Sequence, residues 1–193
     1  RERISEAEAC VIKVLRQTPR SVVAQGNLGA LLLRRGQVAE AAAIFDHAVQ
    51  LVGISEDSDR VRCDAATAHL LLGDFAQGWP AFEARWRLPG YRESLASVAL
   101  PRWDGVADIA GKRLLLLAEQ GYGDTIQFVR YASLARARGA QVVLLVPPHL
   151  VRLLAPLGEV WAIGSPLPAA DFFCPMLSLP LTCGPAPNTP YLA

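Results

Sequence analysis

The residues best suited to chemistry lie in one short segment, residues 119–125, where Glu119 and Asp124 flank two glycines. The apolar run directly before it, residues 113–118, is typical of a strand buried on both faces of a parallel sheet. Ligands of such sheets bind beyond the carboxyl ends of the strands, and this segment is expected there. Glycines at such a place are typical of loops that bind phosphate groups or dinucleotides, and also of simple turns into a helix.

The spacing of residues in this segment decides only in part between a ligand-binding loop and a simple turn into a helix. A dinucleotide fingerprint needs a third glycine where Ile126 stands, and an acidic residue after the second strand, which ends in Val146 and Pro147. A phosphate-binding P-loop is excluded, because no Gly-Lys-Ser/Thr sequence follows. Asp124 with Gln127 three residues later resembles a capping box, which predicts a tight turn and a helix start. A helix cap and a ligand-binding loop both remain open from the residues alone.

The four cysteines show no C-x-x-C spacing and no pair of histidines nearby; they are Cys10, Cys63, Cys174 and Cys183. They are too sparse for a disulfide scaffold and wrongly spaced for zinc. We therefore predict reduced, buried thiols in a cytoplasmic protein, and no metal site.

Two further features have both a structural and a functional interpretation. We interpret His69, which replaces an apolar helix position, as a packed imidazole with one hydrogen bond rather than as a ligand or a base. Trp79, Phe82 and Trp86 recur at helical spacing, and we interpret them as the hydrophobic end-cap of a helical array. A platform that stacks on sugars or bases is the alternative. Pro80 is expected near the start of their helix, where a missing N–H costs nothing.

The first half of the chain repeats itself with a period of 34 residues, as from Ala7 to Ala41 and from Val11 to Phe45. Small residues four positions before large apolar ones, at this period, are typical of tetratricopeptide (TPR) repeats. Residues 1–88 would hold about two and a half repeats, beginning with the second helix of a unit. We therefore expect the chain, which begins without Met, to be a piece of a longer protein.

Small residues in the repeats predict how their helices pack. Gly29 and Ala41 would lie where two antiparallel helices cross, with Phe45 filling the space around the crossing. Turns are expected at Gly36 and Gly73. The third repeat slips by three residues, and we expect the acidic segment 53–59 to be a loop that absorbs the slip.

The second half alternates between apolar runs and amphipathic segments. Residues 89–111 are predicted to form a linker that holds Trp103 as an anchor, and residues 112–193 to form an α/β unit. Strands are expected only after residue 111, at 113–118, 141–146, 160–163 and 171–174, with helices at 124–138 and from about 148 to 154. This alternation predicts a doubly wound, Rossmann-like parallel sheet, so the fold class is α + α/β.

Composition narrows the range of partners. The chain has 193 residues, 52% of them hydrophobic, and its 19 basic and 18 acidic residues give a net charge of +1. So little basic surplus argues against nucleic acid as the main partner. No apolar run reaches the length of a membrane span, and the charged first residues do not resemble a signal peptide.

Several segments closely resemble bacterial TPR-containing glycosyltransferases. They are residues 119–131 (EQGYGDTIQFVRY), 78–79 (GW) with 83–86 (EARW), 101–105 (PRWDG), and 175–180 (PMLSLP) before 190–192 (PYL). The resemblance implies a GT-B glycosyltransferase made of two Rossmann-like halves, with the nucleotide-sugar donor bound mainly by the C-terminal half. Residues 112–193 would be part of the N-terminal half. Since they are too few for a complete half, we expect this chain to be inactive by itself and to need no cofactor of its own.

The resemblance also implies roles for single residues. The Gly-Asp turn is similar to the one that opens the heptosyltransferases, so Asp124 would be the base that acts on the acceptor hydroxyl, with Glu119 as the second candidate. The acceptor, a sugar or a protein, would contact Gln120, Gly121, Tyr122, Gly123 and Thr125.

An interaction module is the alternative function. The repeats would bind a protein or peptide along their concave groove, and the α/β unit would be a non-catalytic cap. A second Rossmann-like half downstream, with basic residues near a donor pocket, would favour the enzyme.

Overall fold

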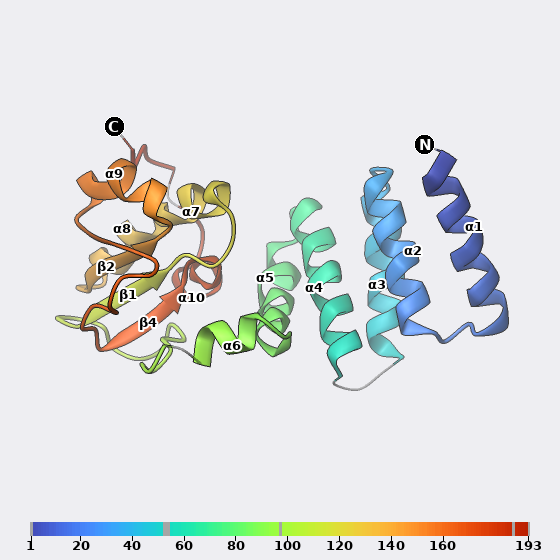
Figure 1. Cartoon of the computed structure of the whole chain (residues 1–193), viewed down its shortest axis with the longest axis horizontal. Helices are drawn as coiled ribbons and strands as arrows, with labels where there is room; N and C mark the ends of the chain where they lie inside the picture. Colours follow the sequence, from blue (N-terminus) through green and yellow to red (C-terminus); the bar gives the residue numbers. More distant parts are fainter. Residues whose placement is uncertain (1, 52–54, 97, 187, 193) are drawn as a thin grey trace. The chain divides into compact units, whose positions relative to one another are not determined.

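The computed structural model describes residues 2–51, 55–96, 98–186 and 188–192 (Figure 1). The chain divides into two compact units, Arg1–Ser97 and Val98–Ala193. The first unit is helical, and the second holds a small parallel sheet with helices. The predicted order of an all-helical part followed by an α/β part is confirmed.

The helical unit contains six α-helices and one 3₁₀ helix among the residues described. They are α1 (Glu2–Gln17), α2 (Val22–Arg34), α3 (Val38–Gln50), α4 (Glu56–Leu71), α5 (Phe75–Phe82), η1 (Glu83–Arg87) and α6 (Tyr91–Ala96). Gly36 and Gly73 lie in the turns after α2 and α4 with φ of 77° and 79°, a conformation that favours glycine. Both predicted turns are therefore confirmed.

The predicted packing of small against large residues is found between α2 and α3. Phe45 and Ala41 on α3 are fully buried. A Cβ atom added to Gly29 would lie 2.4 Å from the Phe45 ring, so only glycine leaves room for this ring.

Two local expectations in the helical unit are wrong. The segment 53–59 is not a loop throughout, because α4 already begins at Glu56. Its start is stabilised by a capping box in which Ser55 and Ser58 each accept a hydrogen bond from the other's backbone N–H; residues 53 and 54 lie outside the described part. Pro80 lies inside α5 rather than at its start, because Asp74 caps the helix directly after Gly73.

The α/β unit holds a four-stranded sheet, and all its strand pairs are parallel (Figure 1). Its elements are β1 (Arg113–Leu117), α7 (Tyr122–Phe128), η2 (Val129–Tyr131), α8 (Ala132–Ala137), β2 (Gln141–Val146), η3 (Pro148–Leu150), α9 (Val151–Leu154), η4 (Ala155–Leu157), β3 (Glu159–Ala162), β4 (Phe172–Pro175), η5 (Met176–Ser178) and α10 (Leu179–Cys183). The strand order is β3-β2-β1-β4. The four predicted strands are confirmed within one residue at each end, and the central leucines of β1 are fully buried, as a strand covered on both faces requires.

The single helix expected at 124–138 is instead three pieces, α7, η2 and α8, and it begins two residues earlier, at Tyr122. The segment expected as a linker also contains structure. Residues 91–96 form α6, and Trp103 is buried in the α/β unit, where its indole N–H donates to the Ala107 carbonyl at 2.9 Å. Arg102 pairs with Phe173 in an isolated β-bridge, so residues 101–103 lie along the free edge of β4. In the described residues, no helix is both long and apolar enough to cross a lipid bilayer.

Candidate functional site

The strand order determines where the segment 119–125 lies. β1 pairs with β2 on one side and with β4 on the other. Because all strands are parallel, the segment after β1 and the start of η5 after β4 emerge at the same edge of the sheet. This is the edge at which the sequence predicts the site.

Asp124 stabilises the start of α7, but not as the sequence suggested. Gly121 is the N-cap residue, with φ −69° and ψ 172°, and Asp124 stands three residues into the helix end. Its Oδ2 accepts a hydrogen bond from the Gly121 backbone N–H at 3.1 Å. The expected partnership with Gln127 is therefore wrong, because the helix begins at Tyr122 and the carboxylate reaches back toward the turn. Within the described residues the Oδ1 atom has no hydrogen-bond partner in the chain.

Glu119 connects the ends of two neighbouring strands. Its Oε1 accepts a hydrogen bond from the backbone N–H of Leu177, directly after β4, at 2.9 Å. This interaction satisfies an N–H group at the start of η5 and holds the ends of β1 and β4 together. The second candidate base therefore already has a structural role.

The other predicted contact residues differ in their exposure. Gln120, Tyr122 and Gly123 are exposed, and the Tyr122 ring packs against His149 with ring centroids 6.0 Å apart. Thr125 is buried, and its hydroxyl donates to the Gly121 carbonyl at 3.1 Å, so it supports the turn instead of facing solvent.

The fold does not require glycine at position 123. Its φ is not positive, and a Cβ added there would meet no atom within 4 Å. Glycine inside a helix costs about 0.5–1 kcal/mol relative to alanine, so the fold alone favours alanine here. An open backbone beside Asp124 is the feature that this glycine provides.

In the helical unit, His69 is a packed imidazole, as predicted. It is buried, and its Nε2 lies 3.1 Å from Asp46 Oδ1. Its Nδ1 lies 3.6 Å from Asp74 Oδ2, so two carboxylates flank the ring.

The aromatic stripe contains a charged group that the sequence did not indicate. The guanidinium of Arg85 lies 4.6 Å from the centre of the Phe82 ring and 4.1 Å from that of Trp86. Arg85 is buried and donates to Glu83 Oε1 at 2.8 Å. That the stripe seals the array against a following domain stays a prediction.

A shallow groove of about 100 Å³ lies between α2 and α4. Val23 and Asn27 line it from α2, and Arg60 and Asp64 from α4. Burial raises the pKa of Asp64 above its ordinary value, while nearby Arg60 opposes this rise. Among the residues described here, no three His, Cys, Asp or Glu side chains are grouped so that they could hold a metal ion.

Comparison with known proteins finds a distant bacterial relative. No model of a protein family and no solved structure matches the chain. Protein FlbA of Caulobacter vibrioides is 32% identical over 146 residues, which are 75% of this chain and 24% of FlbA. The chain is thus similar to about a quarter of a much longer bacterial protein.

Proposed function

We propose that the chain is the N-terminal part of a glycosyltransferase that transfers a sugar from a nucleotide-sugar donor to an acceptor hydroxyl. In this proposal the helical unit is a TPR array that presents the acceptor or a partner. The α/β unit is the acceptor side of a GT-B fold, and the donor is bound by sequence beyond these 193 residues.

The strand order is the observation that carries the proposal. From β1 the sheet grows through β2 to β3 in one direction, and β4 then lies on the other side of β1. In doubly wound sheets, the crevice at such a reversal is where ligands bind. The segment 119–125 follows β1 at this reversal, and it is also the part of the chain whose resemblance to glycosyltransferases is longest.

The geometry around Asp124 supports a role toward an acceptor. One carboxylate oxygen is held by the Gly121 N–H, which fixes the side chain, and the other has no partner in the described chain. Gly123 places no side chain beside this carboxylate, and an added Cβ there would meet no atom within 4 Å, which suits the close approach of an acceptor. We propose that the second oxygen orients the acceptor hydroxyl and takes its proton as the hydroxyl attacks the donor sugar. Glu119, bonded to Leu177, would hold the ends of β1 and β4 together.

The Asp124→Asn variant of the longer protein tests this mechanism. An amide oxygen still accepts from the Gly121 N–H, so the variant should melt within about 1–2 °C of the parent, whereas turnover should fall about 10²–10⁴-fold, the usual contribution of a general base. The measurement is release of nucleoside diphosphate in the presence of acceptor. Asp124→Ala is the control that loses both the cap and the base. Full activity of Asp124→Asn would show that Asp124 is only a helix cap.

The groove between α2 and α4 favours the interaction module as a second candidate. It combines an exposed apolar side chain, Val23, with the amide of Asn27 and the half-buried carboxylate of Asp64. Such a set suits an extended peptide, because amide and carboxylate groups can bond its backbone N–H groups. The same assay separates the two candidates: a longer protein that binds a peptide in this groove, but releases no nucleoside diphosphate with any donor, would be an interaction module.

A further inference from the structure

A second cavity lies wholly within the helical unit, between α3, α4 and the segment formed by α5 and η1. Its volume is about 230 Å³, and its apolar wall includes Val49, Ala65 and Ala81. Arg62 and Arg87 also line it.

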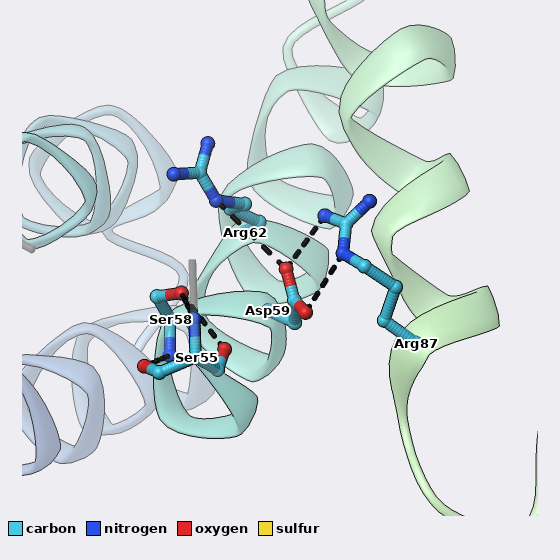
Figure 2. A network of polar contacts seen from close by, with 5 residues as sticks. All are labelled: Ser55, Ser58, Asp59, Arg62 and Arg87. Carbon is cyan, nitrogen blue, oxygen red and sulfur yellow. Dashed lines mark hydrogen bonds and ion pairs between the residues drawn. The ribbon is translucent and has the colours of Figure 1, made fainter. Parts of the chain in front are cut away.

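Both arginines depend on a single buried carboxylate, Asp59, which is 2% exposed (Figure 2). Arg87 occupies both of its oxygens, with Nε 2.8 Å from Oδ2 and Nη2 2.6 Å from Oδ1. The Nε of Arg62 lies 4.0 Å from Oδ1, which is beyond hydrogen-bonding range. The single carboxylate of Asp59 therefore lies near two guanidinium groups, and its interaction with Arg62 is the weaker of the two.

The Nε–H of Arg62 is buried and has no hydrogen-bond partner among the described residues. A buried donor without an acceptor is costly, and native proteins supply an acceptor from the chain, from water or from a ligand. Figure 2 shows the outer nitrogens of Arg62 pointing away from Asp59.

The other carboxylates around the cavity already have cationic or N–H partners. Glu83 accepts from Arg85 at 2.8 Å and from the Trp86 indole N–H at 3.1 Å. Asp46 is bonded to His69. Neither carboxylate lies within ion-pair distance of Arg62 in the described structure. Arg62 is therefore the cation for which a ligand could supply the missing acceptor.

We propose that this cavity binds the carboxylate of a small organic acid through the guanidinium of Arg62. The planar fork of a guanidinium matches a carboxylate, and the apolar wall accommodates a short aliphatic body. Asp46 and Glu83 at the same cavity disfavour a doubly charged phosphate, because like charges repel. The inference does not depend on the proposed transferase activity.

Titration of the whole chain with sodium butyrate tests the proposal. The probe is the Nε–H resonance of Arg62 in a ¹H–¹⁵N spectrum, assigned with the Arg62→Lys variant, and sodium chloride at equal ionic strength is the reference. We expect a saturable shift of this resonance and no saturable shift with chloride. Inorganic phosphate, added in the same way, should bind at least about tenfold more weakly because of the two carboxylates. Equal or tighter binding of phosphate would contradict the carboxylate assignment.

Matched variants separate the site from general charge effects. Arg62→Gln should weaken butyrate binding about tenfold or more, since a charge-assisted hydrogen bond is lost, whereas Arg60→Gln should change it less than about twofold. Arg60 is exposed on the same helix but does not line this cavity. Should Arg62→Gln not fold, Ala81→Leu fills the cavity from a half-buried position and leaves every charge in place. Butyrate binding that is unchanged in both Arg62→Gln and Ala81→Leu would overturn the proposal. So would a loss of butyrate affinity in Arg60→Gln as large as that in Arg62→Gln.

Discussion

Arg85 shows how the helical unit keeps a full charge in its interior. The side chain lies between the rings of Phe82 and Trp86 and donates to Glu83 and to the Phe82 carbonyl. A buried charge is tolerated when it is paired and hydrogen-bonded, and an aromatic face adds attraction to a cation. Polar residues at 83 and 85 are thus part of the packing, although the sequence shows only an aromatic stripe.

The half-buried thiol of Cys63 is expected to react slowly. Desolvation, followed by the nearby Asp64 carboxylate, raises its pKa to about 11. Only the thiolate is alkylated, and with this pKa about 10⁻³ of the thiol is ionised at pH 8. We expect iodoacetamide at pH 8 to modify exposed Cys10 much faster than Cys63, as measured by peptide mass spectrometry.

The rate at Cys63 should rise as the pH approaches 11, because the thiolate fraction then grows. Unfolding in urea should remove the difference between the two residues and serves as the control. Equal rates in the folded chain at pH 8 would contradict the raised pKa of Cys63.

At the scale of elements, the crossing of α2 and α3 tests how closely the helices pack. Gly29→Ala places a methyl group 2.4 Å from the Phe45 ring, so we expect a loss of about 1–3 kcal/mol in the free energy of unfolding. Urea unfolding followed by circular dichroism measures this loss.

Gly123→Ala is the matched control, since the same change in α7 meets no neighbouring atom. It should leave stability unchanged or raise it by up to about 1 kcal/mol. A Gly29→Ala protein as stable as the parent would mean that the two helices lie further apart than described here.

The elements that the sequence predicts correctly are those marked by a pattern of neighbouring residues. The leucines of β1 form an uninterrupted buried run, and glycines at 36 and 73 adopt a conformation that disfavours other residues. The break of the helix after Phe128 and the bridge of Arg102 to Phe173 depend on tertiary contacts, which no local pattern contains.

The candidate site shows the same division. The acidic, glycine-rich segment is visible in the sequence, and its place after the central strand follows from the alternation of strands and helices. That Glu119 bonds to Leu177 is not visible, because the two residues are 58 positions apart. The Asp59–Arg87 pair, 28 positions apart, is hidden from a local pattern for the same reason.

At the scale of the whole molecule, the boundary between the two units lies before Trp103. Residues 98–111 contribute two almost fully buried side chains to the α/β unit, Trp103 and Ile109, and the bridge along β4. We expect a fragment of residues 98–193 to unfold cooperatively on heating.

A fragment that begins at residue 112, the boundary predicted from the change in sequence pattern, loses these groups. Burial of side chains of this size is worth several kcal/mol in total, so this shorter fragment should melt at least about 10 °C lower or not fold. Differential scanning calorimetry of both fragments makes the comparison. Equal melting temperatures would assign residues 98–111 to the linker after all.

The order of the strands also sets the order in which the chain can fold as it is synthesised. Helices α2 and α3 are neighbours in sequence, so their contacts are complete as soon as both have been made. The central strand β1 must instead wait for β2 and then for β4, whose Phe172 stands opposite Leu114. At ~5–20 residues per second, the ribosome leaves the second edge of β1 without its partner for about 3–12 s after Leu117 is added. During that time the backbone N–H and C=O groups along this edge have no strand to pair with, and an unpaired strand edge is a site at which other chains can add.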